Sequence, residues 1–312
     1  MKIRLNPIIK KDFQVAARSM RISWGLFAYE AALALTYMLA ISVIQGINDN
    51  IYGDGNIYKS LIYLFPVLAV AQIVIVAMIM PIMTSSSISG EKERQTFDIM
   101  MTTCMSPFSI VLGKVFSAVL RILFYVAAGM PIMALPFVVG GLKWSSLIYF
   151  LLVVVLIAVL SGSIGIFCSS FCRRSITSVV MSFIIYFVIY FMTFVPALTG
   201  IVLSVSVNAA GEGIRSESLL LLLFNPIVFL EEFFANIMAG TSLFGTADWS
   251  TSGFVSDEVG ILTFALARGR LWMYASAVCI ILMSLMFMLA AAWKVNPIHA
   301  SSVKKKSKKG RN

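Results

Sequence analysis

Apolar residues are gathered along this chain in long blocks that short polar segments separate. Six blocks are each long enough to cross about 30 Å of hydrocarbon, which takes about 20 residues of helix. They lie at residues 23–44, 61–83, 115–139, 147–170, 176–206 and 271–293. We therefore predict an all-α polytopic membrane protein with six transmembrane helices, forming a single transmembrane domain over residues 23–295.

The composition supports the bilayer as the solvent of this domain. The chain is 60% hydrophobic and 12% charged, with a mean hydropathy of +0.94. Soluble domains are about half apolar and about a quarter charged.

Both ends of the chain are basic. Residues 1–22 carry six Lys or Arg, and Asn6-Pro7 is a helix-start pair. Apolar residues then recur at helical spacing from Ile9 to Met20. We expect an amphipathic helix on the inner leaflet and no cleavable signal peptide, because no apolar core follows the basic residues. Residues 296–312 are expected to be a basic, disordered cytoplasmic tail, which either binds anionic lipid or only anchors the topology.

The distribution of positive charge predicts the orientation. With the N-terminus inside, 18 Lys or Arg lie in cytoplasmic segments and five lie in outer segments, while Arg121 falls within a span. This asymmetry follows the positive-inside rule and predicts an N-in/C-in topology. The net charge of +10 thus reflects membrane orientation rather than nucleic acid binding.

The outer segment at residues 208–270 contains one further apolar stretch, at 218–237. A seventh span there would place the basic tail outside and nearly erase the charge asymmetry. Asn225-Pro226 and Glu231-Glu232 also disfavour a straight crossing. We interpret this stretch as a re-entrant or interfacial segment on the outer face.

The sequence lacks the residues that membrane enzymes and ATPases require. It contains one histidine, His299, and no G-x-x-x-x-G-K-[ST] phosphate loop. Cys168 and Cys172 are more consistent with packing than with metal ligation. We therefore expect no catalytic, cofactor or metal site, so energy for any active process has to come from another chain.

Polar residues within the spans are candidate functional positions. Glu30 and Arg121 lie at similar depth, where they either pair with each other or extend to the inner interface. Gln72 is interpreted as an interhelical contact.

A stripe of small residues follows one face of the fourth span. Ser161, Gly165 and Ser169 recur at every fourth position. This spacing favours close helix packing, either within the chain or between two copies.

The charged segment at residues 84–114 is the best-defined polar feature between two spans. We expect an amphipathic helix over 87–105, with Glu91 and Glu93 in an early turn. Its apolar face would consist of Phe97, Met100, Met101 and Cys104. Ser106-Pro107 then restarts a helix that runs through Gly113-Lys114 into the third span.

This segment resembles the membrane-spanning permease subunits of type-2 ATP-binding-cassette (ABC-2-like) exporters. The resembling residues are GEKERQTFD at 90–98, Ser106-Pro107, and IVLGK at 110–114. Met100 and Met101 stand where the family more usually has leucine. The motif covers about a tenth of the chain, and the six-span layout agrees with it.

The resemblance implies a multi-pass permease of a bacterial plasma membrane. Two copies, or this chain with a paralogue, would assemble with cytoplasmic ABC ATPase subunits that bind ATP and Mg. The coupling residues would be Glu91, Glu93, Arg94, Thr96, Phe97 and Asp98. The alternative is a non-transporting membrane sensor or scaffold that recruits a cytoplasmic partner.

Overall fold

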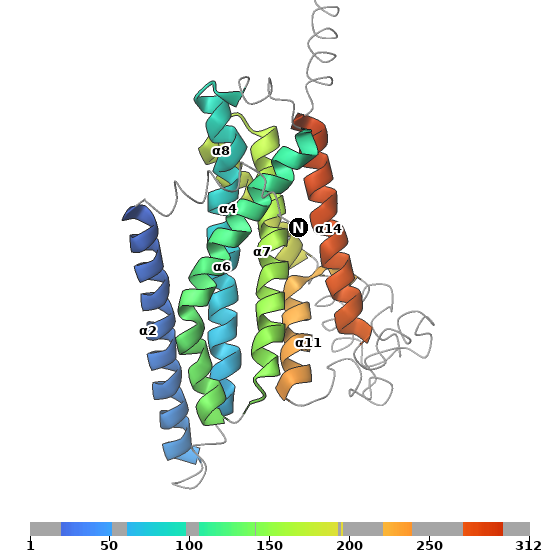
Figure 1. Cartoon of the computed structure of the whole chain (residues 1–312). Helices are drawn as coiled ribbons and strands as arrows, with labels where there is room; N and C mark the ends of the chain where they lie inside the picture. Colours follow the sequence, from blue (N-terminus) through green and yellow to red (C-terminus); the bar gives the residue numbers. More distant parts are fainter. Residues whose placement is uncertain are drawn as a thin grey trace, which may run out of the picture. The chain divides into compact units, whose positions relative to one another are not determined.

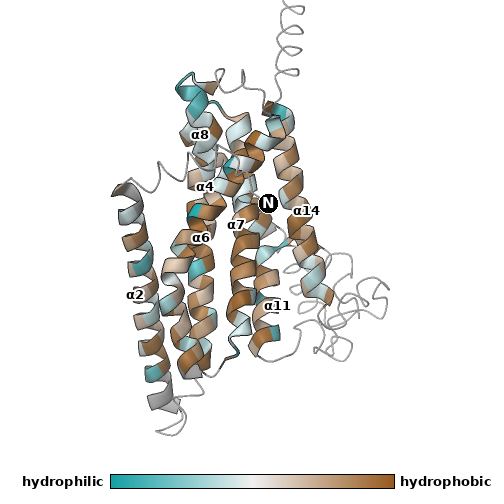
Figure 2. Ribbon diagram, viewed as in Figure 1, coloured by the Kyte–Doolittle hydropathy of each residue, from teal (hydrophilic) through white to brown (hydrophobic). Residues whose placement is uncertain are grey.

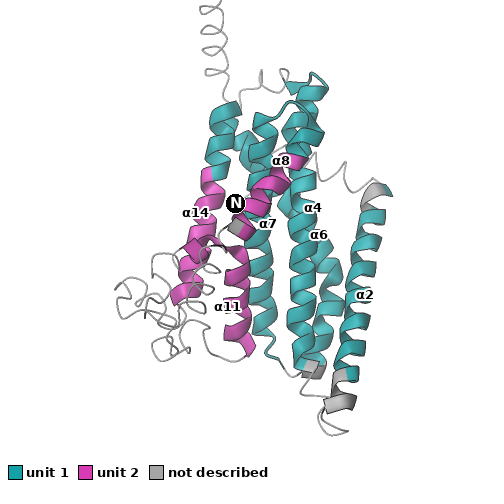
Figure 3. Ribbon diagram, turned by 180° about the vertical axis from the view of Figure 1, so that it is seen from behind, with its two compact units in different colours: residues 1–179, 287–312 teal, residues 180–286 magenta. Residues whose placement is uncertain are grey.

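The computed structural model describes residues 20–51, 61–97, 106–140, 142–192, 195, 221–238 and 271–295. Every regular element in these ranges is a helix. The chain divides into two compact units, shown in different colours in Figure 3. Unit 1 comprises residues 1–179 and 287–312, and unit 2 comprises residues 180–286.

Five helices are long and apolar enough to cross a membrane, within the part of the chain that is described. They are α2 (Met20–Ile51), α4 (Leu64–Glu93), α6 (Pro107–Gly140), α7 (Ser145–Phe171) and α14 (Leu271–Val295). Five of the six predicted spans correspond to them. The predicted span at 176–206 begins as a shorter apolar helix, Ser175–Phe191, and most of its remainder lies outside the described residues.

The predicted N-terminal helix at residues 1–22 is described only from Met20, where α2 begins. The predicted basic tail lies outside the described residues, and so does the outer segment apart from 221–238.

In unit 1, helices α4, α6 and α7 contact one another, and α2 contacts α4 and α6 (Figure 1). Ring contacts of Phe65 with Phe137 and with Phe150 join the beginning of α4 to the end of α6 and the beginning of α7. Helices α4 and α7 therefore run in the same direction, and α6 runs opposite to both. One end of unit 1 thus contains the end of α4, the start of α6, the end of α7 and the start of α8 (Ser175–Phe187). We call this the polar end.

Hydrophobic residues cover the length of the helices, and hydrophilic residues gather where α4 ends (Figure 2). Helix α2 exposes large apolar side chains such as Phe27, Leu35 and Met38. Exposed side chains of this kind are stable where the surrounding solvent is hydrocarbon. The exposed faces therefore agree with a polytopic membrane protein.

In unit 2, helix α8 continues as a π-helical turn, η2 (Val188–Met192). A 3-10 turn, η3 (Leu222–Phe224), and α11 (Pro226–Met238) follow further along the chain. Leu222, Leu223 and Val228 form a small core with Trp272 of α14.

Asn225 and Pro226 separate the two helical pieces of the apolar stretch at 218–237, as the sequence predicts. The Asn225 side chain accepts a hydrogen bond from the Ile227 N–H at 2.8 Å, which caps α11. Its amide group donates to the Tyr190 carbonyl in the π-helical turn at 3.1 Å. Glu232, the second residue of the predicted acidic pair, is buried.

Candidate functional site

Helix α4 continues past the end predicted for the second span, and this corrects the predicted start of the amphipathic helix. The span was expected to end at residue 83, but α4 runs without a break to Glu93. The run of Ser and Thr after residue 83 remains helical because its hydroxyls bond within the helix. Thr84 donates to the Met80 carbonyl at 2.8 Å, and Ser89 donates to the Ser85 carbonyl at 2.7 Å.

Glu91 and Glu93 therefore lie in the last turn of α4, not in an early turn of a separate helix. Acidic side chains are unfavourable at a helix C-terminus, where the dipole is negative. Both carboxylates form hydrogen bonds outside α4 that offset this cost.

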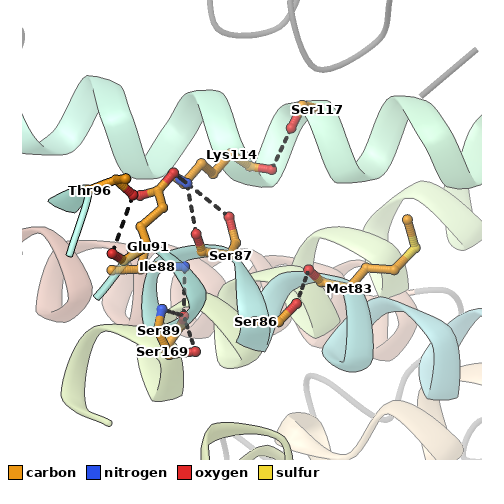
Figure 4. A network of polar contacts seen from close by, with 10 residues as sticks. All are labelled: Met83, Ser86, Ser87, Ile88, Ser89, Glu91, Thr96, Lys114, Ser117 and Ser169. Atoms are coloured by element: carbon orange, nitrogen blue, oxygen red, sulfur yellow. Dashed lines mark hydrogen bonds and ion pairs between the residues drawn. The ribbon is translucent and has the colours of Figure 1, made fainter. Parts of the chain in front are cut away.

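Glu91 forms an ion pair with Lys114 of α6, with 2.7 Å between Oε1 and Nζ. The same ammonium donates to the carbonyl and the hydroxyl oxygens of Ser87, at 3.0 and 3.1 Å (Figure 4). Only 8% of the Lys114 side chain is exposed. Its three N–H groups thus have three acceptors on α4.

Lys92 and Glu93 contact the two helices joined by the basic turn at Arg173-Arg174. The Lys92 ammonium donates to the carbonyls of Ser169, Ser170 and Cys172, where α7 ends. The Glu93 carboxylate accepts hydrogen bonds from the N–H and the hydroxyl of Ser175, at 2.9 and 2.7 Å, where α8 begins. Each charge has the sign that the neighbouring helix dipole favours.

The stripe of small residues on α7 packs against α4 within the same chain, which was one of the two predicted possibilities. A Cβ atom added at Gly165 would collide with the Thr84 side chain and lie 3.2 Å from the Ser85 nitrogen. Ser169 Oγ accepts hydrogen bonds from the Ile88 and Ser89 N–H groups, at 2.9 and 2.8 Å (Figure 4).

Beyond Glu93 the chain forms an exposed turn at residues 94–96. Gln95 adopts a left-handed conformation with φ of 57°, which ends the helix. The Thr96 N–H donates back to the Glu91 carbonyl at 3.0 Å, so the turn is fixed to α4. The Phe97 ring lies 5.7 Å from the Lys92 ammonium.

The remainder of the predicted amphipathic helix, including Asp98, lies outside the described residues. Helix α6 then begins at Pro107, as predicted. Ser106 Oγ accepts a hydrogen bond from the Ser109 N–H at 3.2 Å, which is the capping contact expected of Ser-Pro.

The polar residues predicted within the spans, Glu30, Gln72 and Arg121, form no hydrogen bond or ion pair with the described charged residues of the polar end. Among the described residues, the ion pair is the one between Glu91 and Lys114. Glu30 and Arg121 therefore do not pair with each other. Glu30 Oε1 and Gln72 Oε1 are both buried without a hydrogen-bond partner in the described part. Gln72 is 1% exposed, which agrees with a position between helices.

The sequence interpretation does not reveal that Lys92 and Lys114, both within the charged segment, form these contacts, nor that Ser169 and Ser175 are partners of the segment. Ser169 and Ser175 lie about 80 positions away from it, so no local spacing pairs them. For Lys114 a signal existed: a lysine that continues a helix into an apolar span requires acceptors when it is buried. No group of three or more His, Cys, Asp or Glu that could hold a metal occurs in the described ranges.

These features define a multi-pass helical membrane protein with its charged contacts gathered at one end. Residues 6–295 match the model of the ABC-2 family of transporter proteins, so the chain belongs to that family. It is therefore a permease-type membrane protein of ABC transporters, and the resemblance carried by GEKERQTFD is confirmed. A comparison with curated proteins finds no match.

Proposed function

We propose that this chain is the permease subunit of an ABC exporter and that separate ATPase subunits drive it. The observation that carries the proposal is the family match, which spans nearly the whole chain. The sequence adds support because it contains no phosphate loop of its own. The pathway forms between two copies, or between this chain and a paralogue, in the plasma membrane of a bacterial cell.

The segment at 84–114 is the proposed coupling site, and the orientation is N-in/C-in. This orientation places the polar end in the cytoplasm, where a soluble ATPase reaches it. Arg94 and Thr96 are exposed there, and Phe97 is half-buried beside them. ATP binding moves the ATPase pair, and the coupling segment transmits that movement to the spans.

We propose that Arg94 faces an acidic group of the ATPase. Reversing its charge is then expected to weaken ATPase binding about tenfold, because the two groups would carry like charges. The permease would be co-expressed with candidate ABC ATPases from the same genome, and binding of the purified ATPase to permease nanodiscs would be measured. Lys143→Glu is the control, because Lys143 is also exposed but precedes α7 at the opposite end.

Equal binding by wild type and Arg94→Glu would remove Arg94 from the contact. If no candidate ATPase bound the wild-type chain or gave ATP-dependent transport in proteoliposomes, the exporter assignment would fail. A non-transporting sensor or scaffold would then be the better description.

A further inference from the structure

We propose that Glu91, Lys92 and Glu93 are positioning residues, which tie the end of α4 to α6, α7 and α8, and that the turn at 94–96 is what the partner contacts. The coupling role of these ties rests on the proposed function. The ties themselves are a property of the permease alone, which allows them to be tested separately.

The geometry of a helix explains why three neighbouring charges contact three different helices. Successive side chains point about 100° apart around a helix axis. Glu91 therefore faces Lys114 on α6, Lys92 faces the end of α7, and Glu93 faces the start of α8. One turn of α4 thus contacts the ends of three other helices at the polar end.

The contact with α6 is the least available to a partner. Lys114 is nearly buried, and its ammonium has acceptors on Glu91 and Ser87. A partner that bound Glu91 would have to displace Lys114 and leave a buried charge without its counter-ion, which is costly. The pair therefore acts inside the permease.

The contacts with α7 and α8 satisfy backbone groups that helix ends leave without intrahelical partners. Lys92 donates hydrogen bonds to the last carbonyls of α7, and Glu93 accepts a hydrogen bond from the first N–H of α8. Their loss would loosen both helix ends, not only the side chains. Glu93 is exposed, but both of its oxygens bond to Ser175.

The turn at 94–96 is fixed to this framework by backbone hydrogen bonds. The N–H groups of Arg94, Gln95 and Thr96 donate to the carbonyls of Gly90, Lys92 and Glu91. A force applied to the exposed turn is therefore passed to the last turn of α4, and through its side chains to α6, α7 and α8. This arrangement lets a small contact move several helices together.

The test is a double-mutant cycle on the full chain in lipid nanodiscs without any ATPase. Glu91→Met and Lys114→Met each leave one partner unpaired. Each is expected to speed amide hydrogen exchange in peptides covering 84–97 by roughly tenfold. Because the two residues act through each other, the double variant should exchange no faster than the faster single variant. Lys114→Arg keeps the charge and should restore slow exchange.

Ser86→Ala is the matched control and should leave the exchange of 84–97 unchanged, because Ser86 is exposed and its hydroxyl bonds to the Ile82 and Met83 carbonyls of its own helix. Unchanged exchange in Glu91→Met, or effects that multiply in the double variant, would overturn the internal tie. Should Lys114→Met fail to fold, Glu93→Gln tests the same idea at an exposed position. It should speed exchange in the first turn of α8 roughly fivefold, and no change there would count against the proposal.

The coupling role is then measured with the ATPase added. Glu91→Met and Lys114→Met should each lower permease-stimulated ATP hydrolysis, and the double variant should lower it no further. Additive losses would instead indicate separate contacts with the partner. If the wild-type permease binds no ATPase while the exchange results hold, the proposed function fails and the internal ties stand.

Discussion

Replacing Gly165 by alanine is expected to lower the free energy of unfolding by about 2 kcal/mol, because the added methyl group collides with α4. The nearest atoms belong to Thr84, and the Ser85 backbone nitrogen lies 3.2 Å away, so the side chain alone cannot relieve the contact. Titration with sodium dodecyl sulfate in mixed micelles, followed by tryptophan fluorescence, measures the change.

Gly46→Ala is the control for this prediction. A Cβ at Gly46 of α2 would meet nothing within 4 Å, so the same substitution should be neutral or slightly stabilising there. Adding Thr84→Ala to Gly165→Ala should recover part of the loss. If Gly165→Ala were as stable as Gly46→Ala, the close packing of α4 on α7 would be wrong.

Replacing Ser169 by alanine is also expected to lower the free energy of unfolding by about 2 kcal/mol. The hydroxyl oxygen accepts from two successive N–H groups of α4, those of Ile88 and Ser89, and alanine supplies no acceptor. The same micelle titration applies. A fall in stability without a change in the helical content of the folded state would locate the effect in the contact between the two helices.

Ser163→Ala is the matched control, because Ser163 lies on the same helix and is equally buried. Its hydroxyl donates only to the Leu160 carbonyl in its own helix, at 2.7 Å, among the recorded hydrogen bonds. Its removal should therefore cost less than 1 kcal/mol, since such local bonds contribute little net stability. Equal losses at the two serines would show that the cross-helix bonds do not stabilise the fold.

The sequence predicts those parts of the fold that the solvent or the local backbone dictates. Hydrocarbon thickness determines the length of an apolar span, and five predicted spans have matching helices. The helix start at Pro107 follows from proline chemistry and is confirmed.

The sequence interpretation failed where a polar run remained helical. Thr84 and Ser89 suggested the end of a span, but back-bonded hydroxyls allow such residues to stay buried inside a helix. The partners of Glu91 and Glu93 depend on how distant helices pack, which no local spacing reports. The roles of Asp98 and of residues 193–206 apart from 195 stay predictions, because they lie outside the described residues.

The length of α4 has a mechanical consequence. Its 30 residues give the helix a length of about 45 Å, while the hydrocarbon layer is about 30 Å thick. The second span is predicted to end at residue 83, so the end of α4 beyond it would project from the hydrocarbon, with the turn at 94–96 at its tip. If the pivot lies near the middle of the membrane, a tilt of about 10° displaces this tip by about 5 Å. A displacement of a few ångströms at the turn is thus equivalent to a small tilt of α4 and of the helices bonded to its end.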